Sequence, residues 1–135
     1  MRRKHQSVDV FLAAIVLLHL GVTVVHGWAH AGAVVPVSTS ANIFILTVIV
    51  AAPLAGAAIL WWLSVSGGAW LLAVSLAASL LFGIVNHFVF ASPDHVAHVV
   101  AAWRMSFGVT AVLLALTEAL GSGLAFWRAA HARMR

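Results

Sequence analysis

Four long apolar runs cover most of the chain, at about residues 10–30, 42–63, 69–90 and 94–120. Each run reaches the roughly 20 residues that an α-helix needs to cross a hydrocarbon layer of about 30 Å. Only 7% of the 135 residues are charged, whereas about a quarter of the residues in soluble domains are charged. The sequence therefore predicts an all-α membrane protein with four transmembrane helices in a single domain, residues 1–135.

The basic residues lie mainly at the two ends of the chain. Six of the seven Lys and Arg residues precede the first run or follow the last: Arg2, Arg3, Lys4, Arg128, Arg133 and Arg135. Positive residues favour the cytoplasmic side, so we expect both termini in the cytoplasm and an antiparallel four-helix bundle, N-in and C-in, in a prokaryotic cytoplasmic membrane. Contact with anionic lipid accounts for the net charge of +4, and nothing in the chain predicts nucleic-acid binding.

The connections between the runs contain turn and capping residues. The segment between the first two runs contains Pro36 and a Ser/Thr/Asn cluster, which predicts a helix cap near Ser40 or Asn42. Residues 64–68 and 91–95 read as short turns. In the second turn, Ser92 resembles an N-cap followed by Pro93 in the first helical position. The fourth helix is therefore expected to begin at about residue 93.

The first run contains three histidines, His19, His26 and His30, spaced seven and four residues apart. At 100° per residue they lie within about 40° of one another on a helix surface. Ionisable groups inside a membrane almost always face the bundle interior, so this stripe should point inward. His26 and His30 fall toward the outer end of the helix. His19 falls near the midplane, with no partner at its own depth in another run.

Further polar residues are expected at the same outer end. The third run ends with Asn86 and His87, and the fourth begins with Asp94, His95 and His98. Neutral imidazoles with one carboxylate are typical ligands for copper, iron or zinc, while the absence of cysteine excludes thiolate sites. The preferred metal ligands are His26, His30, His87 and His98, the alternates are Asp94 and His95, and Asn86 could hold the rings in their tautomers. The pairs His26/His30 and Asp94/His98 are each four residues apart and could each place two ligands on one ion.

Other functions remain open at this point. Haem b held between His26 and His87 would make the protein an electron-transfer subunit, although one haem would use only two of the rings. A non-catalytic accessory subunit of a larger membrane complex, or a homo-oligomer, would need no cofactor. No HExxH or HxxHH motif is present, so metalloproteases and membrane desaturases are not supported.

Few charged residues occur within the runs. Arg104 lies near the outer end, where it could contact an anionic lipid or a quinone-like headgroup. Glu118 lies in the inner half, and with His19 it could form a sparse polar path across the bundle. The sequence thus predicts a metal site near the extracytoplasmic surface, used for metal handling or metal-dependent redox chemistry. Whether the protein is an enzyme is left open.

Overall fold

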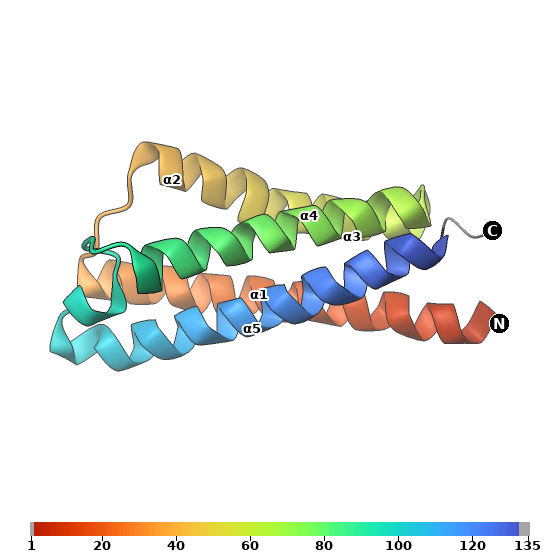
Figure 1. Cartoon of the computed structure of the whole chain (residues 1–135). Coiled ribbons are helices and arrows are strands. Elements are labelled where there is room, and N and C mark those ends of the chain that lie inside the picture. Colours follow the sequence, from red (N-terminus) through yellow and green to blue (C-terminus); the bar gives the residue numbers. More distant parts are fainter. Residues whose placement is uncertain (1, 133–135) are drawn as a thin grey trace.

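The computed structural model describes residues 2–132, with side chains from Ser7 onward, and this part of the chain contains helices but no strand. The order is α1 (Arg2–Ala33), α2 (Thr39–Phe44), the π-helical segment η1 (Ile45–Ala51), α3 (Ala52–Trp62), α4 (Val65–Ile84), the π-helical segment η2 (Val85–Val89), the 3₁₀ turn η3 (Val96–His98) and α5 (Ala101–Ala132). Figure 1 shows the long helices lying side by side, with both ends of the chain at the same end of the molecule.

Within the described residues, four helical stretches are long and apolar enough to cross a membrane: Ser7–Ala33, Thr39–Trp62, Val65–Val89 and Ala101–Ala132. The second stretch combines α2, η1 and α3, and the third combines α4 and η2. The prediction of an all-helical protein with four membrane-length apolar helices is confirmed.

The predicted start of the fourth helix is wrong. α5 begins at Ala101, and residues 90–100 form a connection that contains only η3. Within it, Ser92 Oγ accepts a hydrogen bond from the backbone N–H of Asp94 (3.2 Å), and His95 Nδ1 accepts one from the N–H of Ala97 (3.1 Å). These local side-chain bonds to the backbone compete with helix formation, so Asp94, His95 and His98 lie before α5 and not in its first turns.

Two other boundaries also differ from the predicted ones by a few residues. Ser38, and neither Ser40 nor Asn42, caps α2 by accepting a hydrogen bond from the N–H of Ala41. Ser64 caps α4 by accepting from the N–H of Gly67, so residues 65–68 are already helical. In both cases the capping serine is the residue directly before the helix. From this position its hydroxyl accepts a hydrogen bond from a backbone N–H in the first turn that has no partner within the helix.

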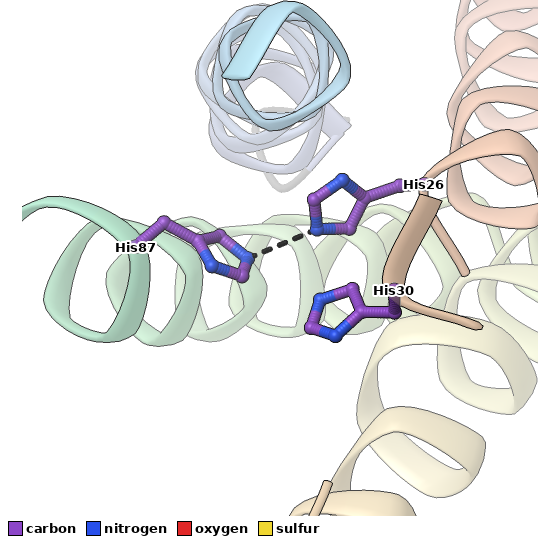
Figure 2. A group of neighbouring side chains, drawn as sticks. All are labelled: His26, His30 and His87. Carbon is purple, nitrogen blue, oxygen red and sulfur yellow. Dashed lines mark hydrogen bonds between the residues drawn. The ribbon is translucent and has the colours of Figure 1, made fainter. Parts of the chain in front are cut away.

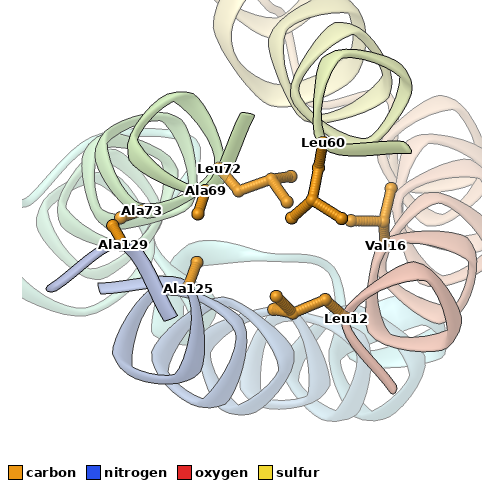
Figure 3. Packing of buried hydrophobic residues seen from close by; sticks show 8 residues of the cluster. All are labelled: Leu12, Val16, Leu60, Ala69, Leu72, Ala73, Ala125 and Ala129. Atoms are coloured by element: carbon orange, nitrogen blue, oxygen red, sulfur yellow. The ribbon is translucent and has the colours of Figure 1, made fainter. Parts of the chain in front are cut away.

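Small residues allow the helices to pack closely at the end of the molecule where α1 begins and α5 ends. The buried cluster there consists of Leu12, Val16, Leu60, Ala69, Leu72, Ala73, Ala125 and Ala129 (Figure 3). α3 and α4 lie close together at Gly68, where an added Cβ would overlap the backbone nitrogen and Cα of Leu60. Backbone atoms cannot move aside as a flexible side chain can, so this contact requires glycine.

Replacing Gly68 with alanine is expected to lower the free energy of unfolding by about 1–3 kcal/mol, the usual cost of overpacking. Gly123 is the matched control because a Cβ added there would have no atom within 4 Å, and alanine at this position should be neutral or stabilising by up to about 1 kcal/mol. Thermal unfolding in detergent measures both variants. Equal midpoints for the two variants would contradict the close contact between α3 and α4.

An ion pair joins the first and last helices close to the chain ends. Arg128 Nε donates to Asp9 Oδ1 (2.7 Å) and Arg128 Nη2 donates to Asp9 Oδ2 (3.2 Å). The two side chains are only 8% and 13% exposed. The bidentate geometry fixes α1 against α5 at this end.

Candidate metal centre

Three of the predicted site residues come together at the end of the bundle away from the termini. His26 and His30 lie one turn apart on α1, and His87 lies in η2. One ligand atom from each of the three side chains lies within 4.8 Å of the others, an arrangement that could hold a metal ion. His26 and His87 are each 6% exposed. Figure 2 shows the His26 and His30 rings turned from α1 toward His87.

Local backbone features position these rings. α1 ends just after His30, where the N–H of Val35 donates to the carbonyl of His30 (3.1 Å) and Val34 adopts a φ of 55°. This is the geometry of a Schellman C-cap, with a strained β-branched residue in place of the usual glycine. His87 lies in a π-helical segment, which changes the direction of its side chain relative to α4 and is frequent at functional sites.

The closest approach is between His26 and His87, whose Nε2 atoms lie 3.2 Å apart. Two nitrogens bound to one tetrahedral ion at about 2.0–2.1 Å lie roughly 3.3–3.4 Å apart. Without an ion, one Nε2–H donates to the other Nε2. An ion could replace that proton with almost no movement of either ring.

Hydrogen bonds on the far sides of both rings are compatible with the tautomers that metal binding requires. His87 Nδ1 donates to the backbone carbonyl of Asp94 (3.1 Å), and His26 Nδ1 lies 2.8 Å from Thr110 Oγ1. The Thr110 hydroxyl can donate to the carbonyl of Ser106 or Phe107, at 2.8 and 3.0 Å. When an ion replaces the proton between the two Nε2 atoms, this hydroxyl can therefore accept from His26 Nδ1, so that both Nε2 lone pairs bind the ion.

Asp94 lies against two of the three rings. Its Oδ1 is 3.2 Å from His30 Nε2 and 3.4 Å from His87 Nδ1. Burial raises the pKa of Asp94, but the close contact with His87 Nδ1 and the neighbouring His30 and His26 rings outweigh burial and hold the pKa below its ordinary value. The carboxylate can thus orient His87 and His30, or supply a fourth ligand.

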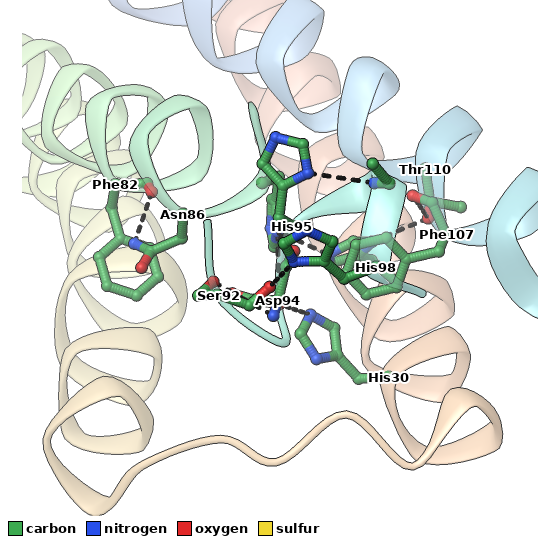
Figure 4. A network of polar contacts seen from close by, with 12 residues as sticks. His30, Phe82, Asn86, Ser92, Asp94, His95, His98, Phe107 and Thr110 are labelled. Carbon is green, nitrogen blue, oxygen red and sulfur yellow. Dashed lines mark hydrogen bonds and ion pairs between the residues drawn. The ribbon is translucent and has the colours of Figure 1, made fainter. Parts of the chain in front are cut away.

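Phe107 forms one wall of the centre. It is fully buried, and its ring centroid lies 4.8, 4.7 and 5.2 Å from those of His26, His30 and His87. Sequence reasoning missed both Phe107 and Thr110, which Figure 4 shows beside the network. The spacing of seven residues from Thr110 to Thr117, followed by Glu118, indicates a polar face on α5 that could have identified Thr110.

The structure does not bring the other predicted residues into this group. His95 and His98 contact each other instead, with ring centroids 5.2 Å apart, and His98 Nδ1 donates to the carbonyl of Ser92 (2.7 Å). The expected Asp94/His98 pair is wrong, because it depended on a helix at residues 94–98. Asn86 Nδ2 donates to the carbonyl of Phe82 (2.8 Å), and its role in holding the histidine rings stays a prediction. Arg104 is exposed, and its Nε donates to the carbonyl of Val99.

His19 has partners at its own depth, contrary to expectation. Its Nε2 lies 3.1 Å from the carbonyl of Ile49, and its Nδ1 lies 3.7 Å from Glu118 Oε1. Ser79 donates a hydrogen bond to the same Glu118 oxygen. Ser79 was also missed, although Ser75, Ser79, Gly83 and His87 follow one another at four-residue spacing on one side of α4.

A cavity of about 410 Å³ joins the two polar groups. Its lining includes all three histidines and Asp94 at one end and Ser79 and Glu118 at the other. The remaining wall comes largely from apolar residues of η1, α4 and α5 and from the segment that leads into α2. The histidine group therefore opens into a cavity that extends along the helices.

A comparison of the chain with protein-family models, curated proteins and solved structures finds no match.

Proposed function

We propose that the protein is an antiparallel four-helix membrane bundle that holds one transition metal ion, copper, iron or zinc, on His26, His30 and His87. The basic chain ends support a topology with both termini in the cytoplasm. The metal centre then lies near the extracytoplasmic surface. Its role is metal handling or metal-dependent redox chemistry at that surface.

The observation that carries this proposal is the set of three histidines whose ligand atoms lie within 4.8 Å of one another. Three imidazoles leave at least one coordination position open, as in catalytic metal sites with three protein ligands. Asp94 can fill that position or orient the rings. The cavity on this side gives an ion or a small substrate room to reach the open position.

Haem b fits this geometry less well. Two axial histidines bind haem iron from opposite faces of the macrocycle, so their ligand nitrogens lie roughly 4 Å apart, about twice a metal–nitrogen bond. The Nε2 atoms of His26 and His87 lie 3.2 Å apart, and His30 lies beside them with its ring centroid 4.8 Å from that of His26. The three rings thus occupy the space that a macrocycle between His26 and His87 would need.

Elemental analysis combined with an absorption spectrum of the detergent-purified protein tests the proposal. One equivalent of copper, iron or zinc per chain, lost in a His26→Ala/His87→Ala double variant, is the expected result. A Soret band would instead assign haem. The proposal would be overturned if the wild-type protein took up neither metal nor haem when each was supplied. The hypothesis of a non-catalytic accessory subunit would then replace it.

Metal affinity is expected to fall at acidic pH, because imidazole binds metal as the neutral base and protons compete with the ion for the ring nitrogens. Asp94 does not cause this decrease. Its pKa is lowered, so the carboxylate stays ionised until the pH falls through that lower value. Zinc titrations from about pH 8 down to the lowest pH at which the protein stays folded measure the effect, and an affinity that stayed constant over this whole range would contradict histidine ligation.

A further inference from the structure

A second buried polar group lies at the other end of the cavity, between α1, α4 and α5. Glu118 is 3% exposed, Ser79 1% and His19 0%. Ser79 and Glu118 line the cavity, whereas His19 lies behind Glu118. None of these residues belongs to the histidine group that could hold a metal.

Hydrogen bonding determines which atom of His19 faces Glu118. The Ile49 carbonyl can only accept, so His19 Nε2 must carry the proton that it donates across 3.1 Å. Neutral His19 then presents the lone pair of Nδ1 toward Glu118 Oε1, 3.7 Å away. This Nδ1 atom is buried and has no hydrogen-bond partner. The Ile49 carbonyl, which determines this tautomer of His19, belongs to the π-helical segment η1.

An ionised Glu118 would leave two acceptors facing each other and one buried negative charge without a cation. Within the described part of the chain, no Lys or Arg forms an ion pair with Glu118. Arg128 is paired with Asp9 instead. The hydroxyl of Ser79 supplies one hydrogen bond but no charge. An unpaired charge inside a membrane is costly, and the group becomes neutral instead.

We propose that Glu118, with His19 and Ser79, is a proton-binding site at the inner end of the cavity. The carboxyl group holds the proton and directs it toward His19 Nδ1, while Ser79 donates to the carboxyl oxygen. A neutral acid beside a neutral imidazole avoids the desolvation of two buried charges. Glu118 lines the cavity, so its proton can exchange with water or a small molecule inside the cavity. Glu118 then acts as the proton donor and acceptor for that molecule.

The other titratable groups lie farther along the same cavity or at the ends of the helices. The cavity is also lined by His26 and His30 of α1, His87 of η2 and Asp94 of the loop before α5. The stretch Thr39–Trp62 and the helix α4 contain no titratable side chain. On α5, the remaining titratable groups are Arg104, Arg128 and His131, none of which lines the cavity. His19 is thus the only titratable partner recorded in contact with Glu118 among the residues described.

A proton is a better ligand for this site than a metal ion. His19 Nε2 is already committed to the Ile49 carbonyl, so only one histidine nitrogen and one carboxyl group remain as strong ligands. A transition metal usually takes at least three protein ligands. A proton needs only one donor atom and one acceptor.

Infrared spectroscopy of the purified, metal-free protein in an ester-free detergent tests the site. The chain has only three acidic side chains, and ordinary carboxyl groups are ionised at about pH 6. We expect a C=O band of a neutral carboxylic acid at this pH, shifted in D₂O because the proton exchanges. The band should disappear in Glu118→Gln, which keeps an oxygen that accepts from Ser79, and should persist in Asp94→Asn.

Two results would overturn the proposal. One is the absence of any neutral carboxyl band at about pH 6 in the folded wild-type protein. The other is a band that survives in Glu118→Gln and disappears in Asp94→Asn or Asp9→Asn. Since the measurement uses no metal, failure of the metal proposal leaves its outcome unchanged, and metal binding by a protein without this band would refute the proton site alone.

Discussion

Replacing His87 with alanine is expected to reduce metal affinity by at least about 100-fold, so that the purified protein no longer carries stoichiometric metal. His87 contributes the Nε2 atom that lies 3.2 Å from that of His26. It is also the member of the group that comes from η2, whereas the other two come from α1. Its loss would leave two ligands on a single helix.

Two matched variants give this prediction its specificity. His98→Ala removes a histidine of η3 whose ring contacts His95 and donates to the Ser92 carbonyl, and metal content should stay unchanged. Thr110→Val removes the hydroxyl that can accept from His26 Nδ1 in the metal-bound protein, and a loss of about 10–100-fold is expected for such a partner. Circular dichroism and thermal unfolding verify that each variant is folded. Equal losses in His87→Ala and His98→Ala would contradict the three-histidine centre.

Arg128→Ala is expected to lower the free energy of unfolding by about 3–5 kcal/mol, the usual cost of removing one partner of a buried ion pair. Arg128 and Asp9 are 8% and 13% exposed and share two hydrogen bonds. Without the guanidinium, the carboxylate of Asp9 would stay buried without a cation. Denaturant unfolding in detergent measures the loss.

Exposed Arg104 provides the control for this prediction. Arg104→Ala removes the same charge from a solvent-accessible position, and a change within about 0.5 kcal/mol is expected. The double variant Asp9→Leu/Arg128→Met should recover most of the lost stability, because apolar pairs often replace buried ion pairs at little cost. If Arg128→Ala and Arg104→Ala cost the same, the ion pair would not stabilise the fold.

Helix spacing was enough to predict one half of the metal centre. His19, His26 and His30 recur at seven and four residues, which places them on one face of α1 whatever surrounds the helix. The buried positions of His19 and His26 follow from the cost of exposing an imidazole to lipid. The membrane-length helices follow in the same way, because long apolar runs must satisfy their backbone groups internally.

Other parts of the site depend on contacts between residues far apart in the sequence. Like His87, His95 and His98 lie near the outer end of an apolar run in the sequence. They nevertheless belong to the loop before α5, in which Ser92 forms hydrogen bonds with Asp94 and His98. No local sequence pattern distinguishes these two histidines from the three that form the candidate metal centre. Their different positions result from the competition between helix formation and side-chain bonds to the backbone.

The sequence by itself determined the class of the protein, the presence of four apolar helices of membrane length and the inward stripe on α1, because these depend on hydropathy and on the 3.6-residue period. Only the tertiary structure decided that His87 is the third ring, that Thr110 and Phe107 surround the group, and that His19 meets Glu118. Each of these contacts joins different helices. The π-helical segments η1 and η2 contribute to two of them, and helix period alone does not predict such irregularities.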